Sequence, residues 1–473
     1  MDGDGTCQPV PDSIAFLASE VAPFPDADPI YQQPLVIIMD YSPCGYPSTI
    51  TEAEVRSIFL GPDGDGSGGV AQKYTQCSYG KFNLNATAFR VVTVTKEDCL
   101  SSIVTECAWW VIAYDGDTGA EALLGPDVFS DVTNVVYIVP PSLGCRWAGL
   151  ALTPGSKLWL VASDDGVRRW ATVLQEALHN YGLPHAFQNG IEYADYSTTM
   201  GRGNVCPNAA EISRMGWATP AAQGGDRIDS SALPLGSVLS FTLPATYLTS
   251  EGNYLRVVPD WLPTYTTPSV GKNIYIALRV NKSGDALMGP FYANKVNMHE
   301  VRADLDKGYP TYWAGGSRPT SFLDTVELLN RKNLATYRLL VYAGSWVGTD
   351  ILRVHLCRYQ ASPDECPTLD FIENRPPPPS PQPPSPQRPP SPRPPPKPPG
   401  RPPSPRPPPR PPPPPNPQPP PSPRPPPNPR APPSPRPPRK PAPPRNPRPP
   451  PKPPAPPKPP APPRSPREPS HGL

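Results

Sequence analysis

The chain has 473 residues, of which 84 are proline, and 58 of these prolines fall in the last 98 residues, 376–473. That tail carries 17 basic residues and one acidic residue, a net charge of +16, whereas residues 1–375 carry 26 basic and 40 acidic side chains, a net charge of −14. This composition excludes a single compact globule, and the acidic body excludes a nucleic-acid-binding protein that relies on overall basicity.

Residues 1–222 alternate short β-branched runs with helical patterns, which is typical of an α/β domain. A helix is expected over Thr51 to Phe59, starting near Ser48 or Thr49 and ending at Gly61. The strands are expected at residues 35–39, 89–94, 135–139 and 158–161.

Two features of this first region are interpreted as structural rather than functional. The stretch Asp63–Gly68 begins like a calcium-binding loop, but Tyr74 stands where the loop needs a glutamate, so a flexible loop is predicted. The pair Trp109 and Trp110 is interpreted as core, with a sugar-binding platform as the alternative.

Strand patterns dominate residues 223–375 and predict a second, β-rich domain. His299 and His355 are isolated there and are interpreted as ordinary hydrogen-bonded histidines. The prediction is therefore an α+β fold with domains at 1–222 and 223–375, followed by the tail. The strands of the second domain are expected at residues 238–243, 273–280, 334–342 and 351–357.

The tail, residues 376–473, repeats short proline runs separated by serine, arginine and lysine. Consecutive prolines exclude helix and sheet, so a disordered polyproline II tail is predicted. Its evenly spaced cations predict affinity for acidic polymers. A solvated linker or an SH3-type ligand is the alternative.

Several features predict a secreted protein. The nine cysteines form no CxxC pair, which favours disulfides, with one cysteine left over, rather than a zinc knuckle. Asn85 and Asn281 begin glycosylation sequons. The start, Met1–Gly5, does not look like a signal peptide, so a truncated gene model or a mature chain is expected. No apolar run reaches the ~18 residues that a membrane span needs, so no span is predicted.

The strongest chemical signal lies between residues 163 and 185. Ser163–Asp165 are expected to cap a helix whose apolar positions recur at helical spacing. The residues at these apolar positions are Val167, Ala171, Leu174 and Leu178.

Three side chains of this segment are predicted to bind a metal. Gln175 and His179 lie four residues apart and therefore side by side on the helix, and Gly182 turns the chain so that His185 returns towards them. Three ligands with an open position predict a catalytic zinc site. The adjacent Glu176 is placed to accept a proton from bound water. An amphipathic core helix with two incidental histidines is the alternative.

The pattern HExxHxxGxxH is the metzincin protease signature, and this chain matches every fixed position except the first, where Gln175 replaces histidine. The variant QExxHxxGxxH resembles the gametolysin family of metzincins, the cell-wall proteases of green algae. Thr75–Lys81 resembles another segment of that family, and Tyr193–Gly201 resembles its Met-turn stretch, which implies that Met200 lies beneath the metal. Cys206–Trp217 resembles the end of the protease domain. The resemblance covers about residues 30–370, and the tail resembles hydroxyproline-rich modules.

The resemblance implies a secreted zinc metalloendopeptidase that cleaves extracellular-matrix or cell-wall glycoproteins with metal-activated water and Glu176 as general base. An amide oxygen is a poorer zinc ligand than imidazole, so Gln175 leaves weaker zinc binding, copper, or an inactive relic as alternatives. A non-catalytic structural wall glycoprotein and a copper-binding matrix module also remain possible. Glu176 favours the enzyme.

Overall fold

The apolar run expected as the first strand forms β2, which is buried along almost its whole length. The structure is a computed structural model that describes residues 29–374, except 268–269, 305 and 307–318. Strand β2 lies inside a five-stranded sheet that is parallel except for its last strand, which runs antiparallel at the edge. The strands, in spatial order, are β4 (Arg90–Thr95), β2 (Pro34–Asp40), β5 (Asn134–Val139), β7 (Lys157–Val161) and β6 (Gly149–Ala151).

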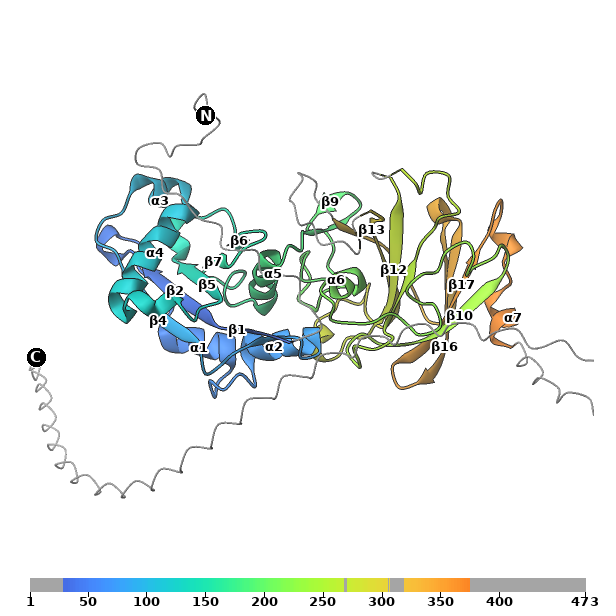
Figure 1. The fold of residues 1–473 in the computed structure, drawn as a ribbon, viewed down its shortest axis with the longest axis horizontal. Coiled ribbons are helices and arrows are strands. Elements are labelled where there is room, and N and C mark those ends of the chain that lie inside the picture. The colour runs from blue at the N-terminus through green and yellow to red at the C-terminus, as the bar shows by residue number, and fades with distance from the viewer. Residues whose placement is uncertain (1–28, 268–269, 305, 307–318, 375–473) are drawn as a thin grey trace, which may run out of the picture. The chain divides into compact units, whose positions relative to one another are not determined.

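Helices cover both faces of this sheet, which explains why its central strands are continuously apolar. Along β2, Val36 and Ile38 enter one core, whereas Leu35, Ile37 and Met39 enter the other. The first core is covered by α1, α2 and α5, and the second by α3 and α4 (Figure 1). These helices are α1 (Glu52–Leu60), α2 (Gly69–Ser78), α3 (Ser101–Glu106), α4 (Trp109–Leu124) and α5 (Trp170–Asn180).

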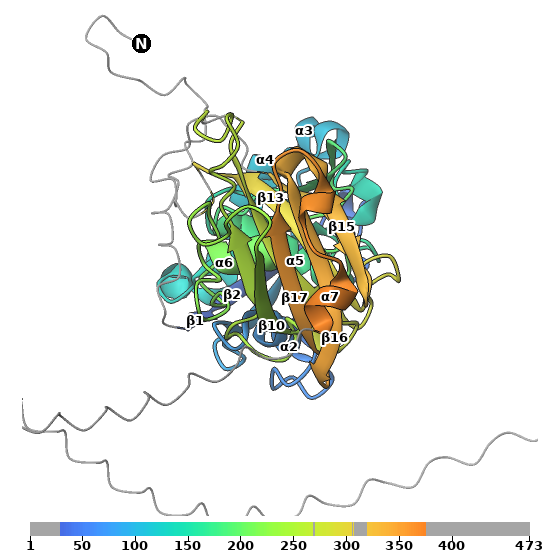
Figure 2. The ribbon, with the colours of Figure 1, turned by 90° about the vertical axis from the view of Figure 1, so that its right-hand side faces the viewer.

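Two further sheets pack face to face around a third apolar core. A six-stranded sheet has the order β11-β12-β13-β14-β8-β9. A four-stranded antiparallel sheet has the order β10-β17-β16-β15, and Figure 2 shows these four strands side by side. The strands are β8 (Ala186–Gln188), β9 (Ile191–Glu192), β10 (Val238–Pro244), β11 (Tyr254–Val257), β12 (Lys272–Arg279), β13 (Lys295–Arg302), β14 (Thr320–Val326), β15 (Asn330–Leu334), β16 (Leu339–Gly348) and β17 (Ile351–Arg358).

The six-stranded sheet combines strands from both sides of the boundary predicted at residue 222, since β8 pairs in parallel with β14. All described residues belong to one compact unit, Met1–Gln382, so the division at residue 222 stays a prediction.

The remaining elements are short. Strand β1 (Ile30–Gln32) pairs with β3 (Phe82–Leu84), and the helices are α6 (Ala209–Arg214) and α7 (Leu369–Glu373). The 3-10 turns lie at Ser42–Cys44, Pro126–Phe129, Pro141–Leu143, Ser283–Asp285, Ala335–Tyr337 and Pro363–Glu365.

The mixed α/β composition that the sequence predicts is confirmed, with small errors at element ends. Helix α1 starts after Thr51, whose side chain accepts the amide hydrogen of Glu54, rather than at Ser48 or Thr49. The strand expected at residues 334–342 is wrong, because a turn at Ala335–Tyr337 separates β15 from β16. Of the tryptophan pair, Trp109 packs against the core but Trp110 is 39% exposed.

Four disulfides confirm the prediction from the scattered cysteines. The residue left over, Cys7, lies outside the described residues, as does the proline-rich tail. No helix in the described part of the chain is long and apolar enough to cross a membrane. The pairs are Cys44–Cys99, Cys77–Cys206, Cys107–Cys145 and Cys357–Cys366.

Candidate metal centre

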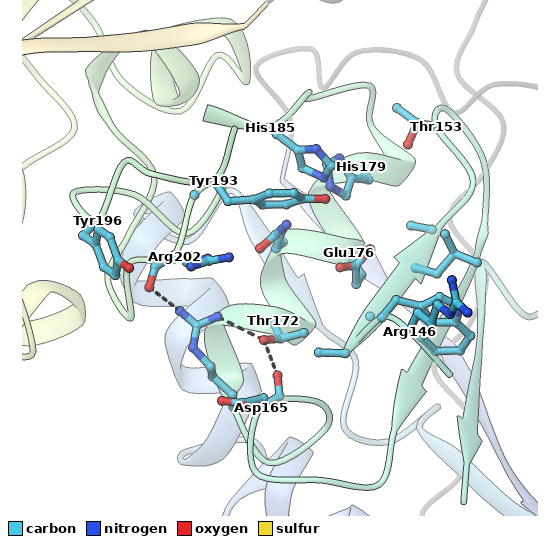
Figure 3. Close-up of a pocket in the computed structure, with 18 residues that line it drawn as sticks. Arg146, Thr153, Asp165, Thr172, Glu176, His179, His185, Tyr193, Tyr196 and Arg202 are labelled. Carbon is cyan, nitrogen blue, oxygen red and sulfur yellow. Dashed lines mark hydrogen bonds between the residues drawn. The ribbon is translucent and has the colours of Figure 1, made fainter. Parts of the chain in front are cut away.

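Helix α5 brings together the polar side chains that the sequence singled out. Its apolar side packs into the core of the five-stranded sheet. Its other side forms one wall of a pocket of about 790 Å³, which Figure 3 shows. Residues three or four apart share one helix face, so the spacing explains the common orientation. The helix residues that line the pocket are Thr172, Gln175, Glu176 and His179.

The helix starts later than the sequence predicts. Ser163–Asp165 were expected to cap it, but the first helical residue is Trp170, and its N-cap, Arg169, makes no side-chain capping bond. The Ser163 carbonyl instead accepts the amide hydrogen of Gly166 in a separate turn. The predicted N-cap is therefore wrong and Val167 precedes the helix, whereas the placement of residues 171–179 on the helix is confirmed.

The turn after α5 returns the chain as predicted. Gly182 has a φ of +82°, a left-handed conformation that favours glycine, and its amide donates to the His179 carbonyl at 2.8 Å. His185 lies three residues after Gly182 and immediately before β8. The ring centroids of His179 and His185 are 4.6 Å apart, with an angle of 79° between the planes. The two imidazoles therefore lie together at one end of the pocket.

Both imidazoles are oriented through Nδ1. His179 Nδ1 lies 2.6 Å from the Leu183 carbonyl oxygen, to which it donates, and His185 Nδ1 lies 2.7 Å from Glu192 Oε1. Each ring therefore keeps the lone pair on Nε2 for coordination. His179 Nε2 is buried and has no hydrogen-bond partner among the described residues. Burial, and next the neighbouring His185, lowers the pKa of His179 to about 3, so this ring is neutral at physiological pH.

Glu176 is buried beside the two histidines, under edge strand β6. A Cβ atom added at Gly149 of β6 would lie 2.6 Å from both Cγ and Oε1 of Glu176, so the carboxyl fits only because that position is a glycine. Burial raises the pKa of Glu176 to about 8. A cation held by the histidines would favour the charged carboxylate and lower this pKa. The group is thus suited to accept and return a proton.

Gln175 completes the set of candidate ligands. It is 7% exposed, and its amide oxygen is a neutral lone-pair donor. No group of three His, Cys, Asp or Glu side chains within the described ranges is placed to hold a metal. A three-ligand site at this pocket therefore needs the amide as well as the two imidazoles. The donor set, two oriented imidazoles and one amide oxygen, fits a divalent cation such as zinc.

Comparison with known protein families gives the family of the chain. The family described as gametolysin peptidase M11 matches residues 33–336, which include the five-stranded sheet, the pocket and most of the two packed sheets. The chain belongs to the gametolysin family. This is a family of metallopeptidases, and the resemblance noted in the sequence is confirmed.

The gametolysin match ends before β16, so β16, β17, α7 and the tail follow it. The chain is also similar to the protein named autolysin from Chlamydomonas reinhardtii, with 25% identity over 263 residues, which cover 42% of this chain and 41% of that protein. The chain thus spans less than half the length of that curated relative.

The stretch that resembles the gametolysin Met-turn lies against His185. Met200 is fully buried, and its carbonyl accepts the amide hydrogen of Ala186, the residue after His185, at 2.9 Å. The Tyr193 ring lies 4.0 Å from the His185 ring, between centroids, and also lines the pocket. Burial, followed by the charges of Glu192 and Glu176, raises the pKa of Tyr193 to about 12, so its hydroxyl is a hydrogen-bond donor. The role of Met200 stays a prediction.

Sequence reasoning assigned no role to Gly149 and Tyr193, which line the pocket, or to Glu192, which binds His185 Nδ1. Gly149 comes from a three-residue strand that no periodic pattern marks. Glu192 and Tyr193 could have been detected, because they form an ionisable pair shortly after the metal-binding motif that ends at His185.

The other residues singled out in the sequence lie away from the pocket. Asn281 is exposed and Asn85 is half-buried, and glycosylation at these two residues stays a prediction. His299 bonds to Ser197 and His355 to Glu373, so both are hydrogen-bonded as predicted.

Proposed function

We propose that the chain is a secreted zinc metalloendopeptidase of the metzincin type that cleaves extracellular-matrix or cell-wall glycoproteins, including hydroxyproline-rich ones. The single observation that carries this proposal is the convergence of two Nε2 lone pairs and one buried carboxyl in one pocket. Gln175, His179 and His185 would hold the metal. A bound zinc ion acidifies water and polarises the carbonyl of the bond to be cut.

Glu176 provides the proton transfer in this proposal. Its carboxylate accepts a proton from the attacking water and then passes it to the leaving amide nitrogen. Its burial against Gly149 excludes bulk water and holds the carboxyl close to the histidines. The Tyr193 hydroxyl is positioned in the same pocket to donate a hydrogen bond to the substrate.

The position of β6 at the edge of its sheet favours a polypeptide as the substrate. It pairs with β7 on one side only in the sheet formed by the described residues, and residues 148–151 line the pocket. An extended peptide can add a strand to such an edge through main-chain hydrogen bonds. A peptide bound in this way would have its scissile bond next to Glu176 and the two histidines.

The location of the substrate is supported by indirect features. Four disulfides favour an oxidising compartment, and the similarity to a protein named autolysin favours the algal cell wall. The proline-rich tail has the composition of wall glycoproteins and would bind acidic wall polymers.

One alternative is a matrix module that binds copper, or binds zinc weakly, without turnover. Gln175 favours this alternative because an amide oxygen is an unusual zinc ligand. Metal analysis of the purified chain, together with cleavage of casein and of a hydroxyproline-rich wall glycoprotein, separates these functions. About one zinc per chain with chelator-sensitive cleavage is expected. Bound copper without cleavage would favour the matrix module.

A further inference from the structure

The pocket carries an excess of positive charge although the body around it is acidic. Three arginines line it, Arg146, Arg169 and Arg202, against two acidic residues, Asp165 and Glu176. Residues 1–375 as a whole have a net charge of −14. A local concentration of cations in a cleft attracts anionic ligands even when the surrounding protein is negative.

One of the three arginines is occupied by structural contacts. Arg169 donates from Nη2 to the carbonyls of Arg202 and Gly203 at 2.9 and 2.7 Å, and from Nη1 to Thr172 Oγ1. The charge of Asp165 also acts on Arg169. The role of Arg169 is therefore to fix the pocket wall.

Arg202 has a fixed backbone and an available side chain. Its amide donates to the Asp195 carbonyl at 3.0 Å, and its own carbonyl accepts from Arg169. The side chain is exposed, lines the pocket and makes no ion pair with a described residue. Figure 3 shows it extending towards the pocket interior from the same side as Tyr193 and Tyr196.

Arg146 lies on the opposite side of Glu176 (Figure 3). It follows Cys145, which is bonded to Cys107, and it comes three residues before edge strand β6. Its side chain is exposed and also makes no ion pair with any residue in the described ranges. The disulfide therefore anchors a second available guanidinium beside the strand that a substrate would pair with.

We propose that Arg146 and Arg202 select polypeptide substrates that carry Asp or Glu side chains on both sides of the bond that is cut. A guanidinium matches a carboxylate with two parallel hydrogen bonds, and the two arginines lie on either side of Glu176 (Figure 3). The inference rests on the proposed endopeptidase function, and it adds the substrate class to it.

The test uses quenched fluorescent peptides of one length that differ only at the two flanking positions, which are both Glu, both Gln or both Lys. With the full chain, kcat/KM is expected to fall about tenfold from the Glu to the Lys peptide, mostly through KM, because the charges bind ground and transition states alike. The difference should shrink at high salt. Equal kcat/KM for the three peptides would overturn the inference.

Charge-reversal variants sharpen the test. The double variant R146E/R202E is expected to prefer the Lys peptide, whereas Arg90→Gln, an exposed arginine on β4 at the far edge of the same sheet, should keep the preference of the parent. Preference for the Glu peptide in the double variant would contradict the role of these arginines.

Binding of the labelled peptides to the Glu176→Gln variant separates this inference from the proposed function. Tighter binding of the Glu peptide without cleavage by the parent would refute the endopeptidase and support charge recognition. Cleavage by the parent without any charge preference in binding would support the endopeptidase and refute charge recognition.

Discussion

At the scale of single residues, the chemistry of the pocket depends on how neighbours orient each candidate group. The Leu183 carbonyl and Glu192 each bind one Nδ1 atom, which directs both Nε2 atoms to coordination. The HxxGxxH part of the motif could be predicted from sequence because helix spacing and one glycine determine it. Gly149 could not, because its position depends on how the short strand β6 packs against the helix.

Replacing Glu176 by Gln tests the proton-transfer role. Gln keeps the size of the side chain but cannot take up a proton, so cleavage is expected to fall by about a hundredfold or more while metal content stays near that of the parent. Metal analysis and peptide turnover on the same preparation measure both quantities. Loss of the metal with the fold intact would make Glu176 a ligand instead.

Replacing Gln175 tests the amide ligand. Gln175→His provides a better zinc donor at the same helix position, so zinc should bind more tightly and activity should stay within about tenfold of the parent. Gln175→Ala removes the donor and should weaken zinc binding strongly. Zinc titration of the three proteins gives the ranking, and an alanine variant that binds zinc like the parent would exclude Gln175 from the site.

At the scale of elements, each error in the sequence prediction has an identifiable physical cause. Helix α4 was not predicted because Gly116 and Gly119 have low helix propensity, yet glycine is needed where the helix packs closely on Tyr137 and Val94. The strand expected over 334–342 was divided because Arg338 adopts a φ of +50°, which an apolar pattern does not reveal. In both places a tertiary contact or a turn overrides the local pattern.

Gly149→Ala tests the contact between edge strand β6 and helix α5. The new methyl group would overlap Glu176, so the carboxyl must move, and cleavage should fall by about tenfold or more with a stability cost of about 1–3 kcal/mol. Gly289→Ala is the matched control, because nothing lies within 4 Å of its Cβ position. Equal losses in the two variants would show that the contact with Glu176 does not matter.

Helix α6 contains a buried carboxyl that gives a pH dependence of stability. Glu211 accepts hydrogen bonds from Thr198 Oγ1 and from the backbone and side-chain amides of Asn208. Burial, despite these donors, raises the pKa of Glu211 to about 7. Because the folded-state pKa exceeds the unfolded value, the contribution to stability is complete below about pH 4.5 and is lost as the pH rises through about 7.

Urea unfolding at pH 5 and pH 8 measures this contribution. The parent should lose on the order of 3 kcal/mol more stability than Glu211→Gln between the two pH values, since glutamine does not titrate. The variant should also be less stable at pH 5, because its NH₂ group faces the donor amide of Asn208. An unchanged pH slope in the variant would contradict the raised pKa.

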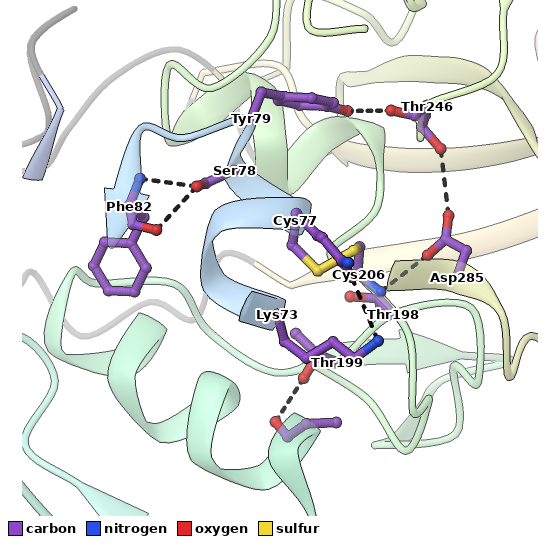
Figure 4. Close-up of a disulfide and its surroundings, with 12 residues drawn as sticks. Lys73, Cys77, Ser78, Tyr79, Phe82, Thr198, Thr199, Cys206, Thr246 and Asp285 are labelled. Atoms are coloured by element: carbon purple, nitrogen blue, oxygen red, sulfur yellow. Dashed lines mark hydrogen bonds between the residues drawn. A yellow bond between two sulfur atoms is a disulfide. The ribbon is translucent and has the colours of Figure 1, made fainter. Parts of the chain in front are cut away.

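At the scale of the whole molecule, a buried junction joins the five-stranded sheet to the packed sheets. The Cys77–Cys206 disulfide connects α2 to the segment before α6, and Figure 4 shows it close to Asp285. Gly284 packs against the disulfide, and Asp285 forms a fully buried ion pair with Arg279. The sequence predicted that disulfides exist but not their pairing, because the pairing follows from tertiary contacts between distant segments.

Deleting residues 376–473 tests the separation of catalysis from retention. All candidate site residues precede Cys206, so cleavage of small peptides should stay within about twofold of the full chain. Binding to beads coated with an acidic polysaccharide should fall, with the largest difference at low salt, where the +16 charge of the tail is least screened.

A chain in which the 17 basic tail residues are replaced by Gln keeps the length and the prolines, and it should behave like the deletion if charge is the cause. Equal retention of the full and truncated chains would refute anchoring by the tail, and retention of the Gln variant would assign it to the prolines instead.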